Sequence, residues 1–502
     1  MQVTRSLFGL VVLAGCPDAG VAVTEAVPGT SSGGGVTDSA EATGAPDGSG
    51  GEVPTTGSGA NTTGAGTGTS GGSSGSSGEP GLTGSSGATG TGGSSGEGSS
   101  GGGVCGDGAV DPGEGCDDGN VLADDGCSPG CEVGPGAAGE PVELPVAPFE
   151  DFVGLTVVDK QALGGASHGL AVVGSIAGAG PESQVAAHVQ LRAAQGGAKL
   201  WAYLGYAGAF GRQAFKAATA ANGDVLVAGW ISTEQVKPDS GGHTWIGRFS
   251  PQGVLLWSVE PMGTWTRPIE AVMTSDGDLA VVGYDVGLGG VSLDAYRFRG
   301  SDGALVWSYS EPWSMVHGGY YAGMALDAED NLYIVGRRFA KEDPKQQAWL
   351  FVRALDADGG ERWEFERVSA KQESLSGRSI TVTTDDQLFV VGVESPGDTM
   401  PTTLLLTGLD LEGEQLWSQT WEPPAPDSVW LAEGVAAPDG GVYLIGGRGP
   451  MDARKGITAR FDAAGSPVWI NPGGASPGLD LALDPDGLLQ VLTKGAVVPY
   501  LP

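Results

Sequence analysis

The stretch "ANGDVLVAGWISTEQVKPDSGGHTWIGRFSPQGVLLW", residues 221–257, contains the pattern that decides the fold. It opens with the turn-forming pair Asn222-Gly223, and the apolar run LVAG at 226–229 follows soon after. A second apolar run, VLLW at 254–257, closes the stretch and ends in tryptophan. Short apolar runs that follow turn signals are typical of strands joined by hairpins.

The same two marks recur through the C-terminal part of the chain. The runs that end in glycine are AVVG (171–174), LVAG (226–229), AVVG (280–283), YIVG (333–336), FVVG (389–392) and YLIG (443–446). The runs that end in tryptophan are AKLW (198–201), VLLW (254–257), ALVW (304–307), ERW (361–363), EQLW (414–417) and SPVW (466–469). The spacing between successive marks of one kind is nearly constant, so the region is an internal repeat.

Each repeat is long enough for four short strands, and its glycine-ending run is apolar on both faces. Such a strand needs a neighbouring sheet on each side, so the units must stack. A period of about 54 residues suits the four-stranded blades of a β-propeller. We predict an all-β propeller over 149–502 with seven blades; six and eight are the alternatives, because the first and last units are degraded. The strand-like segment 149–159, FEDFVGLTVVD, is expected to complete the last blade and close the ring.

The repeated marks resemble those of the pyrroloquinoline-quinone (PQQ) type of propeller repeat, in which a tryptophan docks each blade on the next. The resemblance implies a structural role for Trp201, Trp257, Trp307, Trp363, Trp417 and Trp469. Quinone dehydrogenases of this fold also need metal-binding carboxylates, a catalytic aspartate and a disulfide near the cofactor. The propeller sequence has no cysteine and no matching constellation, so we predict no cofactor and no catalytic residues.

The N-terminus carries an export signal. An apolar segment over 7–15 is too short to span a bilayer, which takes roughly 20 residues, and suits a signal peptide. Leu13-Ala14-Gly15-Cys16 resembles a lipobox, the cleavage site of bacterial lipoprotein precursors. The resemblance implies a signal peptide over 1–15, a diacylglycerol anchor on Cys16 and, because Pro17 follows, release to the outer membrane. An ordinary secretory peptide with an incidental cysteine is the alternative.

Residues 16–103 are expected to form a disordered tether. From Gly57 to Gly103, 39 of 47 residues are Gly, Ser or Thr, and such a stretch cannot bury enough apolar surface to order itself. A spacer of this kind would hold the following domains away from the membrane. A shorter linker is expected over 134–148, between the next module and the propeller.

A compact cysteine module is expected over 104–133. It contains four cysteines, which in an exported chain imply two disulfides of undetermined pairing: Cys105, Cys116, Cys127 and Cys131. A zinc site is the competing interpretation. The pattern CGDG…CDDGN…DGCS…C resembles the Myxococcus cysteine-rich repeat, a module of bacterial surface proteins. Its carboxylates could hold Ca²⁺ instead of forming a merely solvated acidic surface, the candidates being Asp107, Asp117, Asp118 and Asp125.

The net charge and the connections between blades restrict the classes of binding partner that we expect. The chain has 60 acidic and 25 basic residues, a net charge of −35, which argues against nucleic acid and against anionic lipid headgroups. Propellers usually bind ligands at one end of the ring, so we predict a ligand mouth there. Its candidate residues are Arg212, Trp265, Arg267, Trp313, His317, Arg378 and Trp430. Aromatic rings and guanidinium groups could stack on a sugar or a peptide; the alternative is that the rings pack on their own blades.

Taken together, the chain resembles a myxobacterial-type lipoprotein with a propeller. We expect a lipid-anchored, surface- or periplasm-exposed monomer, a non-catalytic binding or scaffold protein for an extracellular protein or glycan. One alternative is a propeller enzyme, quinone-type or polysaccharide-cleaving, in which two carboxylates distant in sequence meet in the channel. Another is an assembly factor similar to the propeller lipoprotein of the outer-membrane barrel machinery.

Overall fold

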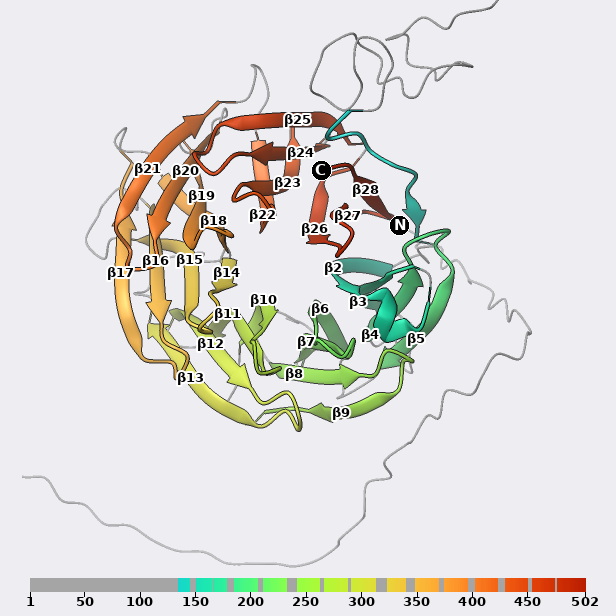
Figure 1. Cartoon of the computed structure of the whole chain (residues 1–502). Helices are drawn as coiled ribbons and strands as arrows, with labels where there is room; N and C mark the ends of the chain where they lie inside the picture. Colours follow the sequence, from blue (N-terminus) through green and yellow to red (C-terminus); the bar gives the residue numbers. More distant parts are fainter. Residues whose placement is uncertain are drawn as a thin grey trace, which may run out of the picture. The chain divides into compact units, whose positions relative to one another are not determined.

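The structure, a computed structural model, describes residues 134–144, 150–165, 167–177, 185–205, 211–232, 242–261, 266–287, 290–312, 323–339, 348–369, 374–395, 402–422, 429–449, 454–474 and 476–502. These residues form seven four-stranded antiparallel sheets and one four-residue helix, α1 (Lys160–Leu163). Figure 1 shows the sheets as blades of a ring. The predicted seven-bladed propeller is therefore confirmed, whereas the predicted signal peptide, tether and cysteine module lie outside the described residues.

Six blades are consecutive along the chain, with their strands in sequence order from the centre outwards. The first blade contains β2 (Glu150–Val158), β3 (Gly169–Ala177), β4 (Val185–Ala193) and β5 (Lys199–Gly205). The second contains β6 (Arg212–Thr219), β7 (Val225–Ser232), β8 (Gly242–Phe249) and β9 (Leu255–Val259). The third contains β10 (Arg267–Met273), β11 (Leu279–Gly287), β12 (Gly290–Phe298) and β13 (Leu305–Pro312).

The next three blades repeat this order. The fourth contains β14 (Gly323–Leu326), β15 (Leu332–Phe339), β16 (Ala348–Leu355) and β17 (Glu361–Arg367). The fifth contains β18 (Ser374–Val382), β19 (Gln387–Ser395), β20 (Thr403–Asp410) and β21 (Gln415–Trp421). The sixth contains β22 (Val429–Ala436), β23 (Val442–Arg448), β24 (Lys455–Phe461) and β25 (Pro467–Gly474).

The seventh blade joins the two ends of the propeller. Its members are β26 (Gly478–Leu483), β27 (Leu489–Thr493), β28 (Ala496–Tyr500) and, outermost, β1 (Val142–Glu143). β1 pairs with β28 through Val142 opposite Val497 and Glu143 opposite Ala496. The ring is thus closed without a covalent bond, by hydrogen bonds between an N-terminal and a C-terminal strand.

The closing strand is not the one that the sequence indicated. The prediction that 149–159 completes the last blade is wrong, because Glu150–Val158 is the inner strand of the first blade. The strand that closes the ring comes from 134–148, the segment expected to be a linker. A two-residue strand shows no periodicity, and only its buried Val142 marks it as part of the core.

The glycine-ending strands explain why the blades must stack. Along β7, Val225 and Val227 pack toward the first blade, whereas Leu226 and Ala228 pack toward the third. The described residues form one buried apolar cluster for each of the seven contacts between neighbouring blades. Both faces of each second strand are therefore buried, as the apolar runs predict.

The tryptophan marks lie on the outer strands and dock each blade on the next. The indole of Trp363, on β17, covers Gly413 of the fifth blade, and its Nε1 donates to the Leu411 carbonyl oxygen at 2.8 Å. The same covering of a glycine recurs in the pairs Trp201–Gly253, Trp257–Gly303, Trp307–Gly359, Trp417–Gly465 and Trp469–Gly136. Gly136 belongs to the N-terminal segment, so the last of these contacts helps to close the ring.

The two ends of the ring differ. At one end, which we call the turn end, lie the connections between the first and second and between the third and fourth strands of each blade. Most are tight turns, such as that of Gly223 (φ +83°), although the first-blade connection contains α1. At the opposite end, which we call the connection end, the chain passes from blade to blade and from second to third strands. Most of these segments lie outside the described residues.

Candidate functional site

A β-bulge at the same height of the inner strands brings polar residues to the centre of the ring. In β6 the register with β7 shifts between Ala214 and Lys216, so that Lys216 pairs with Ala228, the residue before Gly229. Gly323 holds the corresponding position in β14, opposite Val335. The residues that directly follow the shift in the other inner strands are Gly154, Glu270, Ser379, Glu433 and Asp480.

Four residues of this circle form a central ion cluster: Lys216, Glu270, Glu433 and Asp480. The Nζ atom of Lys216 lies 2.9 Å from Glu433 Oε1, 3.1 Å from Asp480 Oδ1 and 3.3 Å from Glu270 Oε2. The four side chains come from β6, β10, β22 and β26, which surround the centre in Figure 1. Lys216 thereby joins strands that are far apart in the chain, since Glu433 and Asp480 follow it by 217 and 264 positions.

The central ion cluster is largely removed from solvent. The exposed fractions are 12% for the Lys216 side chain, 14% for Glu270, 18% for Glu433 and 4% for Asp480. The backbone N–H of Leu155, on β2, donates to Asp480 Oδ2 at 2.6 Å. This hydrogen bond connects the first blade to the central ion cluster. One ammonium thus faces three carboxyl groups in a confined space, where charge interactions are stronger than in water.

The cluster changes the proton affinity of its members. Burial alone lowers the pKa of Lys216, but the charges of Asp480, Glu270 and Glu433 outweigh it and hold this pKa well above its ordinary value. Burial raises the pKa of Glu433 well above its ordinary value, and the charges of Asp480 and Glu270 raise it further against the opposing effect of Lys216. Lys216 therefore stays charged, whereas Glu433 favours its protonated form.

The inner strands approach one another closely around this cluster. A Cβ atom on Gly154 would lie 2.6 Å from the Phe215 carbonyl oxygen and 3.1 Å from Lys216 Cα. A Cβ atom on Gly323 would lie 2.9 Å from Ser379 Cα. Glycine is therefore required at these two places because the neighbouring backbone occupies the space of a side chain.

The predicted ligand mouth is described in part. Arg212, the first residue of β6, stacks on Trp245 with its Cζ 4.7 Å from the ring centroid, and its Nη2 lies 3.3 Å from Glu260 Oε1. Arg267, the first residue of β10, stacks on Phe215 at 4.6 Å. Both lie at the connection end of inner strands, as a mouth requires.

The remaining mouth candidates are not brought together by the described residues. Arg378 lies at the bulge of β18, directly before Ser379, whereas Arg267 lies three positions before Glu270 on β10. Trp430 is part of β22. Trp265, Trp313 and His317 lie outside the described residues, as do Cys16, the four cysteines of the module and its candidate calcium ligands.

The sequence analysis missed the central ion cluster, although a signal was present. Lys216, Glu270 and Glu433 precede the repeat glycines Gly229, Gly283 and Gly446 by one and the same spacing. Asp480 has this spacing to Thr493, which replaces the glycine of the last blade. A charged residue at a fixed place in an apolar strand indicates a shared position in the fold.

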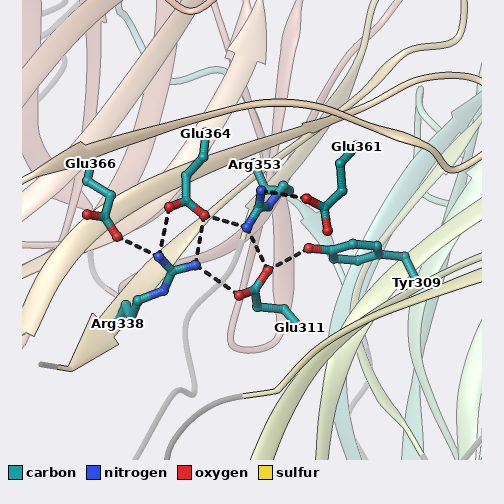
Figure 2. Close-up of polar contacts among 7 residues, drawn as sticks. All are labelled: Tyr309, Glu311, Arg338, Arg353, Glu361, Glu364 and Glu366. Carbon is teal, nitrogen blue, oxygen red and sulfur yellow. Dashed lines mark hydrogen bonds and ion pairs between the residues drawn. The ribbon is translucent and has the colours of Figure 1, made fainter. Parts of the chain in front are cut away.

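A second charged cluster, the outer ion network, lies between the third and fourth blades (Figure 2). It consists of Tyr309, Glu311, Arg338, Arg353, Glu361, Glu364 and Glu366. Arg338 contacts Glu364 at 2.8 Å and Glu311 at 3.0 Å, and the hydrogen bond from Arg338 lowers the pKa of Glu364. These contacts tie β13 to β15, β16 and β17, so the network is a lateral link between blades.

Two other common kinds of site are absent from the described residues. No group of three or more His, Cys, Asp or Glu side chains in this part of the chain is arranged to hold a metal ion. None of its helices has the length and apolar character that crossing a membrane requires.

Comparisons with known proteins find similar folds but no family. Neither a family model nor a curated protein matches the sequence. Solved structures with similarity include BamB from Moraxella catarrhalis, with 15% identity, a TM-score of 0.40 and coverage of 73% of this chain and 99% of that one. Another is an ulvan lyase of polysaccharide lyase family PL25, with 8% identity, a TM-score of 0.42 and coverage of 73% and 94%. Both likenesses are too distant to transfer residues or activity to this chain.

Proposed function

We propose that this protein is a non-catalytic binding or scaffold protein, anchored in a bacterial envelope through a lipid on Cys16. The tether over 16–103 and the cysteine module over 104–133 would present the propeller away from the membrane. The proposed ligand is an extracellular protein or glycan, and the proposed contact surface is the connection end of the ring.

The difference between the two ends of the ring supports this proposal. Turns of similar length recur at the turn end from the second blade to the seventh. At the connection end, the number of residues between second and third strands ranges from two between β11 and β12 to nine between β7 and β8. A repeat fold that keeps one end constant and varies the other can change its ligand without changing its core.

The centre of the ring favours binding over catalysis. Hydrolysis by a pair of carboxyl groups requires the substrate to lie between acids roughly 5–10 Å apart. In the central ion cluster the ammonium group of Lys216 lies between the carboxyl groups, within 3.3 Å of all three. The cluster is thus occupied by the chain itself, which supports a structural role.

The stacking of Arg267 supports recognition at the connection end, whereas Arg212 is buried and already paired with Glu260. Packing on Phe215 fixes the plane of the Arg267 guanidinium, and packing on Trp245 does the same for Arg212. A guanidinium with a fixed orientation loses little entropy when it binds a carboxylate or a row of sugar hydroxyl groups.

Display on the cell surface is the first part of the test. Intact cells that express the full chain are treated with a protease that cleaves within 17–103, and we expect release of the propeller into the medium. With Cys16→Ser, the chain should be missing from the membrane fraction, because the lipid acceptor is gone. Protection of the wild-type chain until the cells are lysed would contradict display and favour the assembly-factor alternative.

Binding is the second part. The Cys16→Ser chain is applied to glycan and peptide arrays, and its ligand is then titrated against Arg267→Ala and Arg299→Ala. Arg299 is a matched control at the turn end, 53% exposed and paired with Asp302. We expect at least a ~10-fold weaker Kd for Arg267→Ala, about the value of one good polar contact, and no change for the control. Equal affinities of the two variants would contradict a ligand mouth at the connection end.

A further inference from the structure

The central ion cluster joins the inner strands of the blade in which the ring is closed to those of blades on both sides of it. Its side chains come from the sixth, seventh, second and third blades, and Leu155 adds a backbone contact from the first. These five blades are consecutive around the ring, and the seventh contains both β1 and β28. The contacts across the centre are therefore concentrated on the side of the ring where the chain is not continuous.

The closure itself is short. β1 has two residues, whereas the outer strands of the other blades have five to eight. Backbone hydrogen bonds from Gly136 to Leu501 and from Leu144 to Gly495 extend it on both sides. The Ala138–Tyr500 bridge and the hydrogen bond from the Gly139 N–H to the Pro499 carbonyl oxygen belong to the same closure. All of these contacts are noncovalent, so the closure gains from additional contacts that hold the neighbouring blades together.

We propose that the central ion cluster is a proton-dependent latch. It holds the inner strands of five consecutive blades together across the closure while one of its carboxyl groups keeps a proton. It loosens the ring when that proton is lost in alkaline solution. This inference goes beyond the proposed binding function and does not depend on it.

The charge balance supports the latch. The cluster contains one ammonium group, on Lys216, and three carboxyl groups, on Glu270, Glu433 and Asp480. Loss of the proton from Glu433 adds a negative charge next to the other two carboxyl groups in the same confined space. Repulsion between like charges at short range would then oppose the attraction to Lys216.

Other groups around the cluster do not replace this proton. Gly154 on β2 and Gly323 on β14 bring no side chain, and Ser379 on β18 brings a neutral hydroxyl group. Further charges on the inner strands are Arg378 at the bulge of β18 and, three positions before the bulge residue of their strands, Arg267 on β10 and Asp151 on β2. Lys216 is the cation that the three carboxyl groups contact directly.

The sign of the pH effect follows from Glu433. Its pKa in the folded chain lies well above the ordinary 4.5, so the folded state binds this proton more tightly than the unfolded state does. The resulting stabilisation is complete below about pH 4.5 and is lost as the pH rises through the folded-state pKa. Lys216 has a raised pKa as well, so its contribution persists at neutral pH and declines only above the ordinary lysine range.

The test is the thermal stability of the full chain, with Cys16→Ser for solubility, measured between about pH 5 and about pH 9. We expect the Tm of this background to fall over this pH range by roughly 4 °C more than that of Glu433→Gln. Glutamine keeps the size of the side chain and one oxygen that accepts from Lys216, but it has no proton to lose. Glu364→Gln is the matched control in the outer ion network. Since its pKa is lowered, its removal should leave the alkaline fall of Tm in place.

A spectroscopic measurement keeps the inference testable if Glu433→Gln fails to fold. Infrared difference spectra of the chain with ¹³C-labelled glutamate should show a protonated carboxyl band at neutral pH that disappears in alkaline solution. The same pH dependence of Tm in Glu433→Gln as in its parent would overturn the latch. So would the lack of a protonated glutamate band at neutral pH.

Discussion

At the scale of single residues, the ring depends on one contact repeated at nearly every blade: an indole that covers a glycine of the next blade. Gly413 has a φ of +91°, and its missing side chain leaves room for Trp363. In the seventh blade Val142 takes the place of the tryptophan and packs on Gly197 of the first blade. A Cβ atom on Gly197 would lie 3.0 Å from Val142 Cγ1. The docking position is thus filled at all seven contacts between blades, six times by tryptophan.

Replacing one docking tryptophan should therefore weaken the whole ring. For Trp363→Ala we expect a loss of about 3 kcal/mol of unfolding free energy, from lost packing and from the hydrogen bond to Leu411. Chemical denaturation checks this value. Leu416→Ala, at a 49% exposed side chain on an outer strand, is the matched control and should cost below about 0.5 kcal/mol. Equal losses for both variants would contradict a docking role.

The repeat glycines are required because a neighbouring backbone leaves no room for a side chain. A Cβ atom on Gly229 would lie 2.1 Å from the Gln213 carbonyl oxygen, and one on Gly283 would lie 2.1 Å from the Arg267 carbonyl oxygen. In these two blades the bulge of the inner strand brings that carbonyl group close to the second strand. The glycine that defines the repeat in the sequence is therefore the counterpart of the bulge that aims Lys216 and Glu270 at the centre.

At the scale of elements, the shortest strand has the largest topological effect. β1 supplies the fourth strand of the last blade and buries Val142 in the cluster that joins the seventh blade to the first. Its two residues protect the edge of β28, which would otherwise be open to pairing with another chain.

A charge in β1 should open the ring. For Val142→Asp we expect a loss of about 2–4 kcal/mol of unfolding free energy, because a carboxylate would be buried among apolar side chains. We also expect faster proteolysis of the C-terminal strands. Glu143→Gln, at the exposed neighbour in the same strand, should change neither quantity. Unchanged stability of Val142→Asp would show that β1 does not close the ring.

Part of the negative charge of the chain comes from aspartates that stabilise the hairpin turns at the turn end. Oδ1 of Asp356 accepts hydrogen bonds from the N–H groups of Asp358 and Gly360 at 3.0 and 2.7 Å. The same pair of bonds recurs in the turns that begin at Asp327, Asp410, Asp462 and Asp484. Aspartate is thus selected in these hairpins because its side chain satisfies two backbone donors.

At the scale of the whole molecule, the chain ends of the propeller meet. The N–H group of Gly136 donates to the Leu501 carbonyl oxygen at 2.9 Å, and the N–H group of Leu501 donates to the Ala137 carbonyl oxygen at 3.0 Å. A closed ring of this kind has no preferred starting blade, apart from the blade in which its ends pair.

The fold should therefore tolerate a change of its ends. A circular permutant in which a short linker joins residue 502 to residue 134, and new ends lie in the exposed turn at Ser301 and Asp302, should fold with a Tm within a few degrees of its parent. Circular dichroism and calorimetry check this expectation. A permutant that remains unfolded would contradict this expectation and show that the fold depends on residues 1–133 or on the original order of the blades.

The sequence by itself determined the repeat, the four-stranded unit and the docking tryptophans, and it indicated seven blades with six and eight as alternatives. These features depend on local patterns, namely turn residues, apolar runs and spacing, which are identical in kind from unit to unit. Only the tertiary structure decided which strand closes the ring and which charges meet at its centre. Val142 pairs with Val497 near the far end of the chain, and Lys216 meets Glu433 at a separation of 217. The constant spacing to the repeat glycines places Lys216 and Glu433 at the same height of their strands, but only the arrangement of the blades decides which of these charges meet.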